Sequence, residues 1–432
     1  MRPKIGVATV AAGLVLLSAS SAAAEAPRDV GASPLPSGFL WGVAGSGFQS
    51  EGYSPDSNWS RYVAAGRTHD PVGTSVDFRH RYREDIARAR DLGVKVFRLS
   101  VEWARLEPAP GQYDPAAWAY YDDVVAAVHE AGMRPMITLD HWVYPGWEFD
   151  RGGWRTDAMI SDWLNNARQV VDRYASYDPM WITINEPVAY IAQEKQIGGL
   201  GSGDLPAAMD RLVQAHRGIY DYVHQVQPGA MVSSNVAYFP TGEEVIDTVF
   251  FNRVVDKLDF IGFDYYYSSS PTDFSFANVA AEPWKVNSAP DGLYYALRHY
   301  ARLYPGKPLY VVENGMPTPD GAPRPDGYTR PEHLADSVYW LERAVQDGVN
   351  VIGYNYWSLT DNYEWGSYEP RFGLYTVNVT SDPSLTRVPT PAVDTYRSII
   401  THGGVAADYR PVHPATECSL VDILDSCLHP AG

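Results

Sequence analysis

The sequence predicts a single (β/α)8 barrel, a fold of the α/β class. Eight short apolar runs recur along the 432 residues, and each is nearly continuous rather than alternating between apolar and polar residues. Such runs are typical of parallel strands that are covered on both faces. Helical patterns lie between them, and eight strand-and-helix units in a row favour a closed barrel over an open sheet. A hydrophobic content of 45% is enough to fill a large core.

The eight expected strands are rich in residues that favour β-structure. In chain order they lie in FLWGVAGS from Phe39, VKVFRLSVEW from Val94, RPMITLDHW from Arg134, MWITINEP from Met180, MVSSNVAYF from Met231, DFIGFDYYY from Asp259, LYVVENG from Leu309 and VIGYNYWSL from Val351. No repeat of short period and no low-complexity linker interrupts this order, so we expect one barrel domain over residues 39–405.

Five helices are expected between the strands. They cover residues 77–93, 115–132, 158–175, 205–224 and 330–348. The first, second and fifth end on glycine, at Gly93, Gly132 and Gly348, as helices often do.

The first 24 residues have the pattern of a signal peptide. Arg2 and Lys4 precede an apolar run, and three small residues, Ala22–Ala24, provide a cleavage site. We therefore expect an exported protein in which residues 25–38 form a leader. Removing Arg2 and Lys4 takes the formal charge from −18 to −20, and an acidic chain is poorly suited to bind nucleic acid or an anionic membrane.

The only two cysteines, Cys418 and Cys427, lie in a C-terminal tail of residues 406–432. In an oxidising compartment we expect a disulfide between them, and two free thiols are the alternative. Their spacing does not match a metal site, and no metal or cofactor is expected.

Polar side chains gather where the expected strands end. In a barrel of parallel strands these ends meet around one mouth, where chemistry takes place. The strand-end residues are Arg98 in the second strand, His141 and Trp142 after the third, Asn185 and Glu186 after the fourth, Asp264 and Tyr266 in the sixth, Glu313 and Asn314 in the seventh, and Trp357 in the eighth, followed by Asp361, Asn362, Glu364 and Trp365.

Glu186 and Glu313 follow strands four and seven, so they are expected to face each other across the mouth. Two carboxyl groups over a pocket rich in aromatic residues suit cleavage of a glycosidic bond. One must be protonated and the other ionised, and Arg98 and Tyr266 are placed to keep one of them anionic. A structural ion-pair network at the top of the barrel is the alternative.

These motifs together resemble glycoside hydrolase family 1, whose members are mainly retaining β-glucosidases and β-galactosidases. The resemblance runs from Phe39 to about Tyr396. It is carried by FLWGVAGSGFQSEG, FRLSVEWARLEP, ITLDHW, WITINEP, DFIGFDYYYSS, LYVVENG and YWSLTDNYEWGSYEPRFGLYTVN, in this order. The combination of N-E-P, E-N-G and W-S-L-x-D-N-x-E-W in one chain is highly specific.

The resemblance implies a role for each matching residue. Glu186 would be the acid/base and Glu313 the nucleophile, which Arg98 and Tyr266 would support. The substrate-binding residues would be Gln49, His141, Trp142, Asn185, Asp264, Trp357, Glu364 and Trp365, with Trp357 as the platform under the sugar ring. The substrate would be a small β-glycoside or an oligosaccharide. Glucose and galactose are not distinguished, and the oligomeric state is not predicted.

Two departures from the family pattern stand out. Asp264 occupies a position where the family usually has asparagine, and an ionised Asp264 would raise the pKa of Glu186. Only 78 positions separate Glu186 from Asp264, so a shortened fifth unit is expected to open the leaving-group side, unless Tyr238 and Phe239 fold over it. An endo-acting barrel glycanase and an inactive sugar-binding protein remain the alternative functions.

Overall fold

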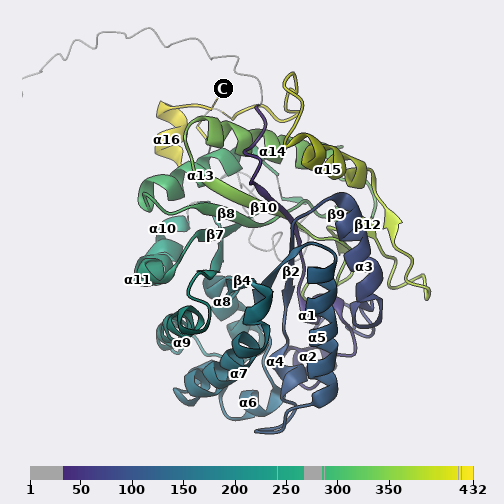
Figure 1. Ribbon diagram of the computed structural model, residues 1–432, viewed down its shortest axis with the longest axis vertical. Helices are drawn as coiled ribbons and strands as arrows, with labels where there is room; N and C mark the ends of the chain where they lie inside the picture. The colour runs from purple at the N-terminus through teal and green to yellow at the C-terminus, as the bar shows by residue number, and fades with distance from the viewer. Residues whose placement is uncertain are drawn as a thin grey trace, which may run out of the picture. The chain divides into compact units, whose positions relative to one another are not determined.

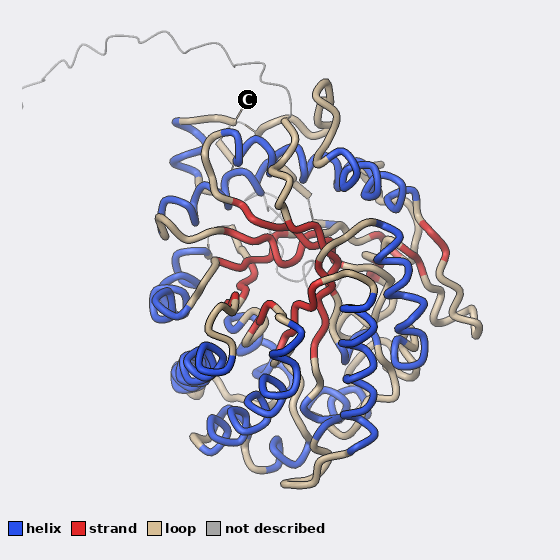
Figure 2. Tube along the Cα trace, in the orientation of Figure 1, coloured by secondary structure: helices blue, strands red, loops and turns tan. Residues whose placement is uncertain are grey.

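The computed structural model describes residues 33–240, 242–266, 285–286, 288–416, 418–419 and 421–431. Those from Ser33 to Ala431 belong to one compact unit. Figure 1 shows this unit as a ribbon, and Figure 2 shows that its helices surround a central group of strands. The expected signal peptide, residues 1–24, and most of the expected leader lie outside the described residues.

The central sheet is the predicted barrel. Its nine parallel strands are β1 (Leu40–Ala44), β2 (Val96–Ser100), β3 (Arg134–Thr138), β4 (Met180–Ile182), β5 (Met231–Ser233), β6 (Asn235–Ala237), β7 (Ile261–Tyr265), β8 (Leu309–Asn314) and β10 (Val351–Trp357). They pair in the order β5-β4-β3-β2-β1-β10-β8-β7-β6. All eight apolar runs therefore form strands, as predicted.

The fifth run forms two strands instead of one. Residues 231–233 pair with β4 and residues 235–237 pair with β7. Ser234 lies between them, and its hydroxyl donates to the Ile184 carbonyl at 2.5 Å. Because β5 and β6 are the two ends of the strand order, this run completes the circuit of the barrel.

The larger helices pack outside the strands. They are α3 (Phe78–Leu92), α5 (Pro115–Glu130), α7 (Ala158–Tyr174), α8 (Pro187–Ile197), α9 (Leu205–Val226), α13 (Asp291–Leu303), α14 (Arg330–Gln346) and α15 (Pro391–His402). Residues 243–257 follow the fifth strand as a succession of short helical turns that includes α10 (Glu243–Ile246), a π-helical turn (Asp247–Phe251) and α11 (Asn252–Val254). The five predicted helices are all present, whereas α8, α13 and α15 were not predicted.

Smaller elements complete the fold. They are the helices α1 (Gly47–Ser50), α2 (Asn58–Ala64), α4 (Trp103–Leu106), α6 (Gly146–Asp150) and α16 (Ile423–Leu428), and the strands β9 (Thr318–Pro319), β11 (Pro370–Arg371), β12 (Tyr375–Thr376) and β13 (Val388–Pro389). Within the described ranges, every helix is too short or too polar to span a lipid bilayer.

Both ends of the described chain pack against the barrel domain. Leu35 is buried and its amide donates to the Gly403 carbonyl at 2.8 Å. In the tail, a disulfide joins Cys418 to Cys427. Arg298 of α13 forms two hydrogen bonds to Asp425 of α16, at 2.8 and 3.1 Å. The tail is thus fastened to α13 by charge pairing as well as by its own crosslink.

Candidate active site

A pocket of about 240 Å3 opens at the carboxyl ends of the strands. It brings together all the residues predicted for the site except Arg98, which lies beneath it. The lining consists of Gln49, His141, Trp142, Asn185, Glu186, Ala237, Tyr238, Phe239, Pro240, Asp264, Tyr266, Val286, Glu313, Trp357, Glu364, Trp365 and Phe372. Parallel strands place these residues at one end because all their carboxyl termini point the same way.

Glu313, one residue before the end of strand β8, is surrounded by hydrogen-bond donors. The Tyr266 hydroxyl donates to its Oε2 at 2.6 Å, and Nη1 of Arg98 donates to its Oε1. Arg98 is fully buried in β2 and also donates from Nε to the Thr138 hydroxyl at 3.0 Å. A guanidinium and a phenol on separate oxygens favour the ionised carboxylate.

Glu186, directly before α8, lies in an environment that favours its protonated form. Burial raises the pKa of Glu186 to about 8, and the charge of Glu313 adds to this effect. A side-chain hydrogen bond to Asp264 and the charge of Arg98 act in the opposite direction. The two glutamates therefore share one pocket but are biased towards different protonation states.

The two glutamates are linked through Asn185. Its side-chain oxygen accepts from Nη2 of Arg98 at 2.6 Å, and its amide nitrogen donates to Oε2 of Glu186 at 3.5 Å. The same oxygen accepts from the Asn235 amide at 2.7 Å. The backbone carbonyl of Asn235 also accepts a hydrogen bond from the backbone amide of Glu186 at 2.9 Å. Asn235 therefore holds Glu186 directly through its backbone and indirectly through its side-chain contact with Asn185.

Asn235 was not among the predicted site residues. It is fully buried at the start of β6. In the sequence, Asn235 is marked only as a polar residue beside apolar strand residues. That pattern does not predict which groups its side-chain amide contacts.

Asp264 stands in β7, where the strand register pairs it with Glu313. The Asn235 amide donates to its Oδ2. Burial, and then the charges of Glu313 and Glu186, raise the pKa of Asp264 well above its usual range. Its other oxygen, Oδ1, has no hydrogen-bond partner among the described residues.

The inner end of the pocket holds a second polar network. Trp357 donates from Nε1 to one oxygen of Glu364 at 3.0 Å, and Gln49 donates from Nε2 to the other at 3.2 Å. The Gln49 amide also donates to Asn362 at 3.1 Å. Burial raises the pKa of Glu364 to about 7, with a further contribution from Glu313. Carboxylate and amide groups in this arrangement are suited to hold neighbouring hydroxyl groups.

Aromatic rings are stacked beside this network. The His141 ring is parallel to both Trp357 and Trp365, with centroid distances of 6.0 and 5.9 Å. Trp142 stacks on Trp365 at 4.6 Å. Burial and the charge of Arg98 lower the pKa of His141 well below its usual range, so the ring is neutral. Its Nδ1 has no hydrogen-bond partner among the described residues.

Three of the site residues adopt left-handed backbone conformations. Trp142, Glu186 and Trp365 have φ values of 69°, 41° and 43°. Such conformations are unfavourable for residues with side chains and are maintained by the surrounding structure. For Trp142, the indole Nε1 donates to the Asn185 carbonyl at 2.9 Å, which ties strand three to strand four at the mouth.

The outer part of the pocket is mainly apolar. Tyr238, Phe239 and Pro240, which follow β6, line it together with Phe372 and Val286. Of the two alternatives for the shortened fifth unit, the described residues therefore match the one in which Tyr238 and Phe239 form a wall.

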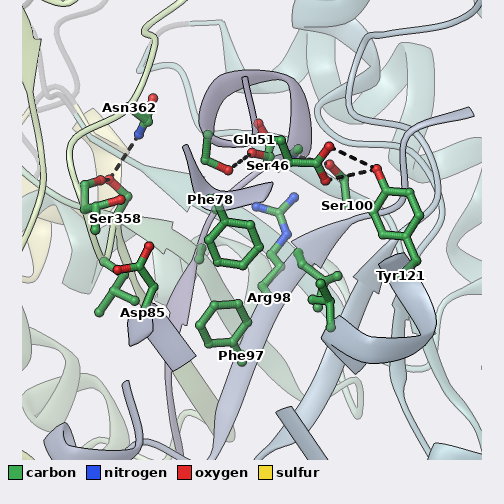
Figure 3. A pocket seen from close by; sticks show the side chains of 18 residues that line it. Ser46, Glu51, Phe78, Asp85, Phe97, Arg98, Ser100, Tyr121, Ser358 and Asn362 are labelled. Carbon is green, nitrogen blue, oxygen red and sulfur yellow. Dashed lines mark hydrogen bonds between the residues drawn. The ribbon is translucent and has the colours of Figure 1, made fainter. Parts of the chain in front are cut away.

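A smaller cavity of about 40 Å3 lies between β1, β2 and residues 358–362 (Figure 3). Its volume suits about three water molecules rather than a sugar. The Tyr121 hydroxyl and Glu51 are hydrogen-bonded at its edge at 2.9 Å, and Asn362 donates to Ser358 at 3.1 Å. Ser46 donates to Oε1 of Gln49 at 2.7 Å. The cavity thus lies behind the Gln49 network, and its lining helps to orient that amide.

Known proteins with similar sequences include several named as β-glucosidases and one named as a galactolipid galactosyltransferase. A family model described as "Glycosyl hydrolase family 1" matches residues 32–241 and 242–405. Beta-glucosidase A of Acetivibrio thermocellus is 28% identical over 423 residues, which cover 80% of this chain and 94% of that enzyme. A protein of Oryza sativa subsp. japonica named "Beta-glucosidase-like SFR2, chloroplastic" is 28% identical over 369 residues. The match covers 76% of this chain but only 56% of the rice protein.

The fold is also found in solved structures. A β-glycosidase from Pyrococcus horikoshii superimposes with a TM-score of 0.75 at 25% sequence identity. The superposition covers 87% of this chain and 96% of the archaeal enzyme.

Proposed function

The chain belongs to glycosyl hydrolase family 1 and is a β-glycosidase, and from that premise we propose that it is an exported, retaining exo-β-glycosidase, with β-glucosides as its main substrates. One observation carries the proposal. In one pocket, Glu313 receives hydrogen bonds from Arg98 and Tyr266, while the pKa of Glu186 is raised to about 8. A double displacement needs this division between an ionised and a protonated glutamate.

In the first step Glu313 is the nucleophile. Its carboxylate forms a bond to the anomeric carbon as the bond from that carbon to the leaving-group oxygen breaks. Glu186 transfers its proton to the departing oxygen, so the aglycone leaves as a neutral alcohol. Arg98 and Tyr266 hold the Glu313 carboxylate in position for this attack.

In the second step Glu186 is the base. It takes a proton from a water molecule whose oxygen bonds to the anomeric carbon, and the ester bond to Glu313 breaks. Two inversions at the same carbon return a product with the β configuration. Glu186 regains its proton and Glu313 its charge, so the enzyme is ready for another cycle.

The inner network supports recognition of one terminal sugar. Gln49 and Glu364 are placed for adjacent hydroxyl groups, and the neutral His141 has a ring nitrogen to offer. Trp357 presents an indole to the apolar face of the ring. These groups enclose the inner end of the pocket, which favours release of single sugars from chain ends over cleavage within a chain.

Export is supported by two independent features. Residues 1–24 have the pattern of a signal peptide. The disulfide between Cys418 and Cys427 suits an oxidising compartment outside the cytosol.

A panel of aryl β-glycosides that differ only in the sugar tests the proposal. Rapid release of the aryl group, fastest from the β-glucoside, with a β-configured sugar as the first product by NMR, is the expected result. Release only from longer oligosaccharides would indicate an endo-acting glycanase, and binding without release a sugar-binding protein. Either result would overturn the proposal.

A further inference from the structure

Trp142, in the wall of the pocket, has its three polar groups engaged in hydrogen bonds. Its backbone amide donates to Oδ1 of Asp140 at 2.9 Å, and its indole Nε1 donates to the Asn185 carbonyl at 2.9 Å. Its backbone carbonyl accepts from Nδ2 of Asn58, also at 2.9 Å. Trp142 is therefore held from three sides in a left-handed conformation, with a φ of 69°, which a residue with a side chain adopts only when its surroundings impose it.

Asn58, the first residue of α2, clamps the segment that follows Trp142. Its backbone amide donates to the Tyr144 carbonyl at 3.1 Å, and its side-chain oxygen accepts from the Tyr144 backbone amide at 3.1 Å. A backbone N–H can only donate and a backbone carbonyl can only accept, so these contacts fix which end of the Asn58 side-chain amide faces each group. Asn58 is 1% exposed, so solvent does not compete for them.

Glu194 completes this network from α8, the helix that follows Glu186. Its Oε1 accepts from Nδ2 of Asn58 at 2.8 Å, and its Oε2 accepts from the Tyr144 hydroxyl at 2.7 Å. Glu194 is buried, and a buried carboxyl group is stable only when its oxygens have hydrogen-bond partners. The same carboxyl group therefore ties α8 both to α2 and to the segment that follows β3.

We propose that Asn58 and Glu194 are positioning residues for sugar binding, and that they act through Trp142. Asn58 holds the Trp142 backbone, and Glu194 orients the Asn58 amide, so that one N–H is directed to Glu194 and the other to the Trp142 carbonyl. Neither residue is among the described residues that line the pocket. The proposal rests on the proposed function, because it takes this pocket as the site of the terminal sugar.

The position of Trp142 determines the shape of the sugar site. Its indole stacks on Trp365 with a centroid distance of 4.6 Å, and Trp365 is in turn parallel to His141 at 5.9 Å. Without its backbone anchor, Trp142 would relax towards a negative φ, and the indole would leave this stack. The sugar would then lose contact in the ground state and in the transition state alike, so KM should rise more than kcat falls.

Three variants test the network. Asn58→Asp keeps the acceptor for Tyr144 but loses both N–H donors, and it places a second carboxyl group beside Glu194. Glu194→Met loses both acceptors. Glu194→Gln keeps an acceptor for Asn58, and its amide can donate to the Tyr144 hydroxyl, which also accepts. Asp336→Asn on α14 is a matched control, because the buried Asp336 accepts hydrogen bonds from two tyrosine hydroxyls at 2.7 and 2.6 Å but lies outside the pocket.

The measurements are kcat and KM for an aryl β-glycoside and the inhibition constant of glucose, at a temperature at which circular dichroism shows each variant to be folded. In Asn58→Asp and Glu194→Met we expect KM and the inhibition constant to rise by about tenfold or more, with kcat reduced by less than about threefold. Glu194→Gln and Asp336→Asn should stay within about threefold of wild type in all three constants.

Asn58→Ala, with the same expected rise in KM, replaces Asn58→Asp if the added charge prevents folding. An unchanged KM in Glu194→Met or in the Asn58 variant would overturn the proposal. So would a rise in Asp336→Asn as large as theirs, which would mean that any loss of a buried hydrogen bond has this effect. A loss in Glu194→Gln as large as in Glu194→Met would also overturn it, because the amide keeps the contacts that orient Asn58.

Near-ultraviolet circular dichroism gives a test that does not depend on catalysis. The difference between wild type and Trp142→Phe identifies the signal of the stack between Trp142 and Trp365. Asn58→Asp and Glu194→Met should lose most of that signal, whereas Asp336→Asn should retain it. Retention of the signal in Asn58→Asp would overturn the proposal. If the wild-type enzyme cleaves no aryl β-glycoside, the proposed function fails, and the circular dichroism still decides whether Asn58 and Glu194 position Trp142.

Discussion

Glu313, one residue before the end of β8, lies between a guanidinium and a phenol that both donate hydrogen bonds to it. Glu186, directly before α8, instead lies near the carboxyl groups of Glu313 and Glu364, whose charges raise its pKa. Both residues are glutamates at the mouth of one barrel. Their difference lies in what other strands place around them: β2 contributes a cation to the first, and β8 a carboxyl group to the second. The position of each glutamate around the barrel thus determines which groups surround it. Those groups determine its protonation state and therefore its chemical role.

Removing Glu313 is the most severe test of this difference. Glu313→Ala is expected to lower kcat by about 10^4-fold or more with every substrate, because the variant lacks the carboxylate that forms the covalent intermediate. A 2-fluoro sugar with a good leaving group should label Glu313 in the wild-type enzyme, as peptide mass spectrometry would show. Labelling of Glu186 instead would reverse the two roles.

Removing Glu186 should have an effect that depends on the leaving group. Glu186→Ala is expected to lose about 10^2- to 10^4-fold with poor leaving groups, which need a proton, and little in glycosylation with activated ones. Added azide should then give a β-glycosyl azide, identified by NMR. An α-azide would contradict the assignment of Glu313 as the nucleophile.

The donors around Glu313 can be weakened without removing the nucleophile. Tyr266→Phe keeps the ring but loses the hydroxyl that donates to Oε2 at 2.6 Å. A hydrogen bond to a charged group contributes about 1.5–3 kcal/mol, so we expect kcat/KM to fall roughly 10- to 150-fold. Tyr62→Phe, on α2 and outside the pocket, is a suitable control. An unchanged kcat/KM would show that Arg98 alone is sufficient.

The pKa of Glu186 should change during the reaction. In the free enzyme the alkaline limb of kcat/KM is expected near pH 8, with activity lost above it as Glu186 gives up its proton. Once Glu313 is an ester its charge no longer raises the pKa of Glu186, so this pKa should fall by about one unit. Carbon NMR of labelled glutamate, in free and 2-fluoroglycosylated enzyme, measures the change. Equal values would mean that the two carboxyl groups are not coupled.

The smallest effect is expected at the outer wall, far from both charges. Phe239→Ala should reduce kcat/KM for aryl glycosides by about threefold to tenfold, since it removes apolar contact with the leaving group. Methyl glycosides should be affected less. Leu303→Ala on α13, at a residue 41% exposed, is the control. A similar loss for methyl and aryl glycosides would place Phe239 in the sugar site instead.

The barrel could be predicted because parallel strands covered on both faces leave a plain signal in the sequence. The split of the fifth strand could not, because it involves the contact of Ser234 with the carbonyl of Ile184, which lies just beyond β4 in a distant part of the sequence. Helix α13 was not predicted, although its sequence, DGLYYALRHYARL, separates clearly into an apolar and a polar face.

The site could be predicted as far as topology determines it. Strand ends meet at one mouth, so Glu186 and Glu313 were expected to share a pocket. Asn235 was not predicted because its role in the site consists of hydrogen bonds to Asn185 and Asp264. These contacts depend on the register of three strands, which the sequence does not reveal.

The stack formed by His141, Trp357 and Trp365 has an optical consequence. Two indoles lie parallel to one neutral imidazole at about 6 Å, and Trp142 touches the same group. A sugar that enters the pocket must displace water from these rings, so the intrinsic fluorescence of the protein should report occupancy directly. The enzyme therefore contains its own unlabelled sensor, which would allow affinity to be measured even for glycosides that it does not cleave.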